Sequence, residues 1–131
     1  MPVERFSKDA NLSGGPGAAG RARRIVEAEL TARLPGTVVA DVSLLVTELV
    51  ANGVVHGGAT DDSYVRLLLE GAKPGLHVEV VNPNHGPGVP ARRAADFGGG
   101  GGIGLNLVEL LASRWGVRSL PQTTVWFELD C

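Results

Sequence analysis

The sequence predicts an α+β fold, a two-layer sandwich in which a mixed, mostly antiparallel sheet is covered on one face by three helices. Apolar residues recur with helical spacing in three separate segments. Segments with strand character come in two consecutive pairs, and each pair is interrupted by a short turn that contains proline. Strands joined by short turns pair antiparallel, and the apolar stripes of helices must be buried, so a two-layer arrangement follows.

Length and composition point to a single domain that covers residues 1–131. A chain of 131 residues, 44% of them hydrophobic, can bury a sizeable core without disulfides or metals. The net charge of -2 argues against a broad basic surface that would neutralise nucleic-acid phosphates. The lone Cys131 excludes an internal disulfide, and neither a signal-peptide pattern nor an apolar run of membrane-spanning length occurs. We therefore expect a cytoplasmic protein without direct contact to nucleic acid or membrane.

The N-terminal part is expected to supply an arm and two helices. The first elements are an arm or edge strand within residues 1–17, with its strand around residues 3–6, and a helix over residues 22–34. The Pro35-Gly36 pair is expected to end this first helix. Thr37 or Asp41 is expected to cap the second helix, which continues to residue 56.

The C-terminal part is expected to supply the sheet and a third helix. The predicted elements are strands over residues 64–69, 76–81, 115–120 and 123–129 and a helix over residues 103–114. Residues 83–102 lack periodicity and are rich in glycine and proline. A loop of this length in a small domain is usually functional or disordered, and we interpret it as a lid over a ligand. Trp115 and Trp126 are expected in the core.

The second predicted helix carries polar residues beside its apolar stripe. Glu48, Asn52 and His56 recur at a spacing of four residues, so a carboxylate, an amide and an imidazole project from one helix face. A solvated polar edge is the more common origin of such a pattern. The Gly57-Gly58 stop after this face and two glycine-rich segments further along instead favour a site for a phosphate-bearing ligand.

The segment VTELVANGVVHG at residues 46–57 resembles the N box of the GHKL ATPases, which have the Bergerat nucleotide-binding fold. Within this superfamily the sequence resembles the bacterial anti-sigma-factor serine/threonine kinases. By this resemblance Glu48 is the general base that activates the attacking hydroxyl, and Asn52 holds the Mg²⁺ that bridges the ATP phosphates. Both residue types suit these roles, because a carboxylate accepts a proton and an amide oxygen is a hard ligand. His56 resembles the histidine that closes this box, with a packing role as the alternative. Val55 stands where many relatives have arginine.

A second segment, residues 78–90, resembles the G1 box, in which the family has an aspartate followed by glycines. No aspartate is present in this segment, and two alignments are possible. One places Asn82 at the position of the aspartate. The other places Asn84 there, with Gly86 and Gly88 following in the usual spacing. We favour Asn82, because strand alternation carries its side chain into the layer of the apolar residues before it. The family's carboxylate accepts a hydrogen bond from the adenine amino group. An amide accepts one without the help of a charge, so we expect ATP binding to be weakened about five- to thirtyfold.

A third segment, residues 98–108, resembles the G2 box, in which a glycine-rich loop leads into a helix. By this resemblance Gly102, Gly104 and Leu105 lie against the nucleotide. Glycines let the backbone approach phosphate oxygens, and the free N–H groups of a helix start carry a partial positive charge. Five consecutive glycines alone are also typical of a flexible linker, but three boxes in this order are a much more specific signal.

The resemblance covers nearly the whole chain and implies an ATP-binding anti-sigma factor that works with Mg²⁺. Such a protein sequesters a sigma factor and phosphorylates a serine or threonine of an antagonist protein, and relatives are often homodimers. The changed G1 box favours an alternative, a binding-only regulator with a weakened nucleotide site on the same fold. The detached catalytic domain of a histidine kinase ranks last, because nothing in this sequence supplies dimerising helices and a phosphoacceptor histidine.

Overall fold

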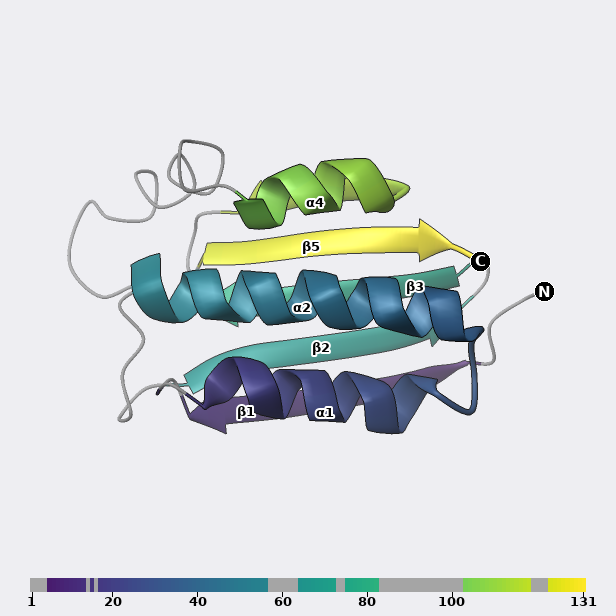
Figure 1. The fold of residues 1–131 in the computed structure, drawn as a ribbon, viewed down its shortest axis with the longest axis horizontal. Coiled ribbons are helices and arrows are strands. Elements are labelled where there is room, and N and C mark those ends of the chain that lie inside the picture. Colours follow the sequence, from purple (N-terminus) through teal and green to yellow (C-terminus); the bar gives the residue numbers. More distant parts are fainter. Residues whose placement is uncertain are drawn as a thin grey trace.

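The computed structural model describes residues 5–13, 15, 17–56, 64–72, 75–82, 103–118 and 123–131, with the backbone alone for residues 53–56, 72 and 103–105. Within these residues, five strands form one sheet in the order β1-β2-β3-β5-β4, and three helices cover one of its faces (Figure 1). Each pair of neighbouring strands in this part of the chain is antiparallel. The predicted α+β sandwich is confirmed, with a described sheet that is antiparallel rather than mixed.

The strands alternate between a buried face and an open face. Their bounds are β1 Phe6–Ser13, β2 Tyr64–Ala72, β3 Gly75–Asn82, β4 Arg114–Arg118 and β5 Thr123–Asp130. In β3 every second residue from Leu76 to Asn82 is buried, and the residues between them are half-buried. A period of two is the pattern of a sheet with helices on one face and solvent on the other.

Three helices form the second layer, and their bounds are α1 Ala18–Leu30, α2 Gly36–His56 and α4 Ile103–Leu111. α2 crosses the middle of the sheet, with α1 on the side of β1 and β2 and α4 on the side of β5 (Figure 1). The stripe that α2 buries completely consists of Val42, Leu45, Val46, Leu49 and Val50. These side chains belong to the same core as Val78 and Phe127 of the central strands, and this packing fixes α2 on the sheet. None of the described helices is long and apolar enough to span a membrane.

The first strand and the first helix lie elsewhere than predicted. β1 occupies residues 6–13, where it pairs with β2 over its whole length, so it extends well beyond the strand predicted around residues 3–6. Residues 3 and 4 of that prediction lie outside the described residues. α1 spans Ala18–Leu30 rather than residues 22–34. After Leu30 the chain turns toward Pro35, and the Leu30 carbonyl accepts hydrogen bonds from the backbone N–H groups of Arg33 and Leu34 at 2.9 and 3.0 Å.

The start of α2 and the end of α4 also differ from their predictions. The Pro35 carbonyl accepts a hydrogen bond of 3.0 Å from the backbone four residues later, so Thr37 and Asp41, the two predicted caps, lie inside α2. α4 ends at Leu111 rather than at residue 114, because Arg114 already pairs with β5 as the first residue of β4. Apolar spacing alone does not define such boundaries.

The two tryptophans have different surroundings. Trp115 packs half-buried against the core. The prediction for Trp126 is wrong, because this residue lies on the open face, where its ring stacks on that of His77 with centroids 5.9 Å apart. Strand alternation explains the difference, since Phe127 takes the neighbouring buried position. A Cβ atom at Gly116 would lie 2.7 Å from Nε1 of Trp126, so glycine on the adjacent strand makes room for the indole.

A row of charged side chains crosses the open face beside this indole. The His77 ring lies between two carboxylates, with Nδ1 2.9 Å from Glu128 Oε2 and Nε2 2.8 Å from Glu79 Oε2. Arg114 Nε donates to the other oxygen of Glu128 at 2.9 Å. Arg118 Nη2 donates to the other oxygen of Glu79 at 3.2 Å. Burial lowers the pKa of His77, but the hydrogen bonds and charges of the two carboxylates raise it by more, so the pKa lies above its ordinary value.

Raising the pH from about 6 to about 8 is expected to reduce the free energy of unfolding by up to about 1 kcal/mol through His77. Because the pKa of His77 is higher in the folded chain, its contribution is fully present below the ordinary pKa of about 6.5 and is lost as the pH rises through the folded-state value. Urea unfolding at several pH values measures this loss. The control is His77→Gln, which lacks the titrating ring, and a pH dependence equal to that of the wild type would contradict the assignment.

Candidate functional site

The ends of four elements lie at the same end of the sandwich (Figure 1). They are the C-terminal ends of α2 and β3 and the N-terminal ends of β5 and α4, all at the left of Figure 1. Asn82 and Thr123 stand opposite each other in the pair formed by β3 and β5, and α2 contacts both β3 and α4. Segments far apart in the sequence therefore meet at one place.

Two predicted site residues lie in the C-terminal half of α2. Glu48 and Asn52 are half-buried and about one helical turn apart, beside the fully buried Leu45 and Leu49. This part of the chain is helical because a continuous apolar stripe is buried along it. The same packing holds the carboxylate and the amide at the edge of the core, on one face of the helix.

Asn82 ends β3 on the buried face of the sheet, with 0% of the residue exposed. Neither its Oδ1 nor its Nδ2 has a hydrogen-bond partner among the described residues, and the same holds for the buried Nδ2 of Asn52. A buried polar group without a partner costs about 1–3 kcal/mol, and folded proteins contain few of them. Two such amides at one end of the sandwich fit a site where a ligand completes their hydrogen bonds.

The buried hydroxyl of Ser43 also lacks a partner in the described part of the chain, but it lies away from this place. Ser43 precedes Asn52 by nine residues on α2, which corresponds to about 13.5 Å along the helix axis. Its backbone carbonyl accepts a hydrogen bond from Thr47 Oγ1 at 2.6 Å. Ser43 is therefore not part of the site formed at the end of α2.

Asn82 is the asparagine that strand alternation predicts on the buried face, and the structure places it there with Val78 and Val80. The competing candidate, Asn84, lies outside the described residues. The same is true of the glycines predicted to contact the nucleotide from the loop, Gly86, Gly88 and Gly102. The roles of these four residues stay predictions.

Three further predicted residues are placed by their backbone. His56 is the last residue of α2, and Gly104 and Leu105 are the second and third residues of α4. The first turn of an α-helix has N–H groups without a partner inside the helix, and the helix dipole favours a negative charge there. The start of α4 therefore offers the anion-binding backbone that the third glycine-rich segment predicts.

Thr123 also belongs to this place, although its position in the sequence gives little sign of it. It is fully buried at the start of β5, opposite Asn82. A buried threonine at the end of a strand is ordinary by itself. Only the register between β3 and β5 shows that Thr123 lies next to Asn82. The available signal is its inward position, two residues before the buried Val125.

Comparison with protein families identifies the kind of domain that carries these residues. The sequence model of the family described as "Histidine kinase-like ATPase domain" matches residues 12–129, which extend from β1 into β5. The chain belongs to this family. The resemblance to the GHKL ATPases is confirmed at this level, and membership implies that the domain binds ATP. A comparison with curated proteins finds no match.

The donor set of this ATPase domain fits Mg²⁺ that is bound together with a nucleotide. No cluster of three or more His, Cys, Asp or Glu side chains that could hold a metal alone occurs among the described residues. Mg²⁺ in nucleotide sites usually takes only one or two protein ligands, because phosphates and waters supply the others. Glu48 and Asn52 offer oxygen atoms of the kind that Mg²⁺ prefers. Asn52 thus fits a ligand that shares the ion with ATP.

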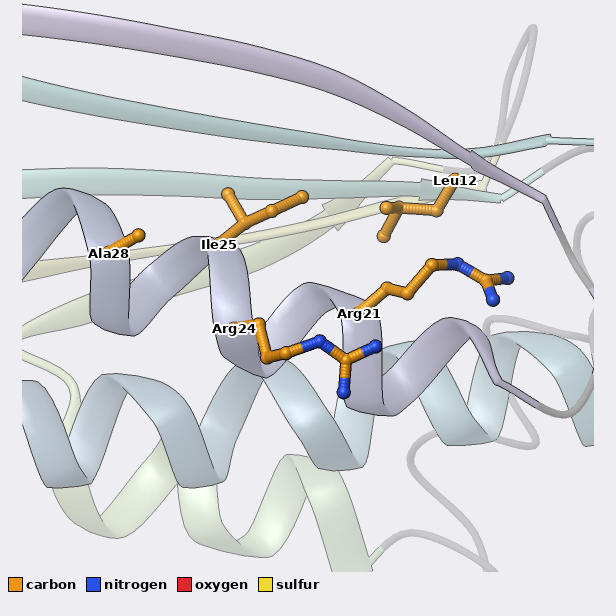
Figure 2. Close-up of a pocket in the computed structure, with 5 residues that line it drawn as sticks. All are labelled: Leu12, Arg21, Arg24, Ile25 and Ala28. Carbon is orange, nitrogen blue, oxygen red and sulfur yellow. The ribbon is translucent and has the colours of Figure 1, made fainter.

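An open groove of about 390 Å³ lies between α1 and β1, which is an edge strand of the described sheet (Figure 2). Its lining residues are Leu12, Arg21, Arg24, Ile25 and Ala28. Arg21 Nη2 donates to the Ser13 carbonyl at 2.9 Å and so ties the start of α1 to the end of β1. None of the site residues described above lines this groove, so it is separate from the place around Asn82.

Proposed function

We propose that this ATPase domain is a serine/threonine protein kinase of the anti-sigma type, which regulates transcription by switching between partners. The observation that carries the proposal is the carboxylate of Glu48, which lies one helical turn before Asn52 on α2. Both residues lie near the end of the sandwich that also holds the buried amide of Asn82. Phosphoryl transfer to a hydroxyl needs a proton acceptor close to the metal that binds the phosphates. This pair of residues supplies both groups from one helix face.

The proposed reaction gives roles to Glu48, Asn52, Asn82 and the start of α4. ATP, when bound, supplies the γ-phosphoryl group for transfer to the hydroxyl of a serine or threonine. Glu48 accepts the proton of that hydroxyl, and Asn52 would hold Mg²⁺, which would orient the phosphates. The N–H groups at the start of α4 bind phosphate oxygens, and Asn82 binds the base. Most of the acceleration comes from positioning and from neutralisation of charge, because the protein contributes little covalent chemistry to phosphoryl transfer.

The proposed partners are a sigma factor, which the protein sequesters, and an antagonist protein, which is the substrate. The resemblance to the anti-sigma-factor kinases supports both partners, a homodimeric state and a place in the cytoplasm. The net charge of -2 supports an action through proteins rather than through direct contact with nucleic acid.

A binding-only regulator on the same fold is the second candidate. The observation that favours it is the neutral, fully buried amide of Asn82, which takes the place of the family's charged aspartate in the alignment that we favour. Without this charge the nucleotide is held less tightly, and regulation would depend on protein contacts alone. The presence of both Glu48 and Asn52 favours the kinase over this candidate.

Transfer of labelled γ-phosphate to a co-purified partner tests the proposal. MgATP is first expected to raise the melting temperature, because a ligand at 100 times its dissociation constant stabilises the folded state by about 2.7 kcal/mol. The kinase is then expected to label a serine or threonine of the partner. A wild-type protein that binds its partner and MgATP but transfers no phosphate with Mg²⁺ or Mn²⁺ is a binding-only regulator.

A further inference from the structure

We infer that the site takes purines of two kinds, those with a 6-amino group, such as adenine, and those with a 6-oxo group, such as hypoxanthine. The inference rests on the nucleotide site of the proposed function and concerns the selectivity of that site for the base. The residue that carries it is Asn82. Its carboxamide is fully buried, and both of its polar atoms are unpaired among the described residues.

The surroundings of Asn82 suit the base of a nucleotide rather than its phosphates. On the buried face its neighbour in β3 is Val80, which stands opposite Val125 of β5, and both valines are fully buried. A polyphosphate carries several negative charges and would lose much of its hydration there. A purine is flat, uncharged and polar only at its edge, so it enters an apolar layer when a hydrogen-bonding group meets that edge. The half-buried Asn52 and the start of α4 suit the charged end of the nucleotide.

A carboxamide presents one donor and one acceptor side by side. Adenine presents the complementary pair, the 6-amino group as a donor and N1 as an acceptor. Hypoxanthine presents the reverse pair, O6 as an acceptor and N1–H as a donor. A half-turn of the Asn82 amide about its Cβ–Cγ bond exchanges donor and acceptor, so the same side chain pairs with either base.

No contact in the described part of the chain selects one orientation of this amide. Neither Oδ1 nor Nδ2 of Asn82 has a partner there that a half-turn would break. Torsions about such sp³–sp² bonds are broad and roughly twofold, so both orientations are open to the side chain. A carboxylate at this position would only accept hydrogen bonds and would repel O6 of a 6-oxo purine. Asparagine rather than aspartate at position 82 therefore decides which base is accepted as well as how tightly it binds.

Calorimetric titration with MgATP and MgITP measures this selectivity directly. The wild type is expected to bind both nucleotides with dissociation constants within about tenfold of each other, because each base completes two hydrogen bonds with the amide. Asn82→Asp is expected to bind MgATP about five- to thirtyfold more tightly than the wild type does, since its acceptor is charged. The same variant is expected to bind MgITP at least about 100-fold more weakly than MgATP.

The outcomes separate this inference from the function on which it rests. A wild type that binds MgATP but binds MgITP more than about 100-fold more weakly overturns the inference and leaves ATP binding intact. A wild type that binds neither nucleotide overturns the nucleotide site itself. An Asn82→Asp variant that folds but has the wild-type affinities shows that another residue contacts the base, and so overturns the role of Asn82.

A second variant keeps the test decisive if the buried aspartate prevents folding, which circular dichroism detects. Asn82→Ala removes donor and acceptor together and is expected to weaken MgATP and MgITP binding by similar factors, about five- to thirtyfold each. A variant that loses affinity for only one of the two nucleotides contradicts the inference.

Discussion

Replacement of Glu48 by alanine is expected to slow phosphate transfer to the partner by about 10²- to 10⁴-fold while MgATP still binds. A general base acts on the hydroxyl in the transition state and contributes little to the affinity for the nucleotide in the ground state. Partner binding is expected to persist, because alanine is a good helix former and the buried stripe of α2 is unchanged. The transfer rate of labelled γ-phosphate and a calorimetric titration with MgATP measure the two effects in the same preparation.

Asn52→Ala is the matched variant one turn further along α2. Unlike Glu48→Ala, it is expected to affect nucleotide binding as well as phosphate transfer. It should lose the Mg²⁺-dependent part of nucleotide binding together with transfer, because in the proposed mechanism the Asn52 side chain holds the ion. Titration with ATP in the presence of Mg²⁺ and of a chelator isolates this part. The assignment fails if Glu48→Ala transfers phosphate at the wild-type rate, or if Asn52→Ala keeps the full effect of Mg²⁺.

Leu67→Ala is expected to lower the free energy of unfolding by about 2–5 kcal/mol, whereas Leu110→Ala is expected to change it by less than about 0.5 kcal/mol. Leu67 is fully buried in β2 and stands opposite Val80 of β3. Leu110 of α4 is 78% exposed. The chemical change is identical, so the difference isolates the apolar surface and the cavity at the buried position.

Urea unfolding of both leucine variants measures this difference, with the midpoint and the slope of each transition compared with those of the wild type. An equal loss of stability in the two variants would contradict the core described above. A large loss for Leu110→Ala alone would show that this exposed face of α4 is covered, for instance by a second copy of the chain.

The sequence by itself determined which segments are helices and strands over most of the chain. β2, β3 and β5 follow the predicted ranges closely, because alternation of apolar residues is a local property that pairing in a sheet preserves. The shared face of Glu48 and Asn52 also follows from helical spacing alone. The inward position of Asn82 follows from the period of its strand. Membership of the ATPase family is likewise a property of the sequence, because the three boxes and their order along the chain indicate it.

Only the tertiary structure decided the features that depend on contacts between distant segments. The extent of β1 depends on its pairing with β2, and the open-face position of Trp126 depends on which face of β5 the helices cover. The His77 ring contacts Glu128 as well as Glu79 of its own strand, because β3 and β5 pair in a register that joins residues 51 positions apart. That the buried amide of Asn82 has no hydrogen-bond partner among the described residues became evident in the same way, because it depends on the groups that packing brings around the side chain. Local periodicity states which way a side chain points, whereas its partners are set by the packing of the whole domain.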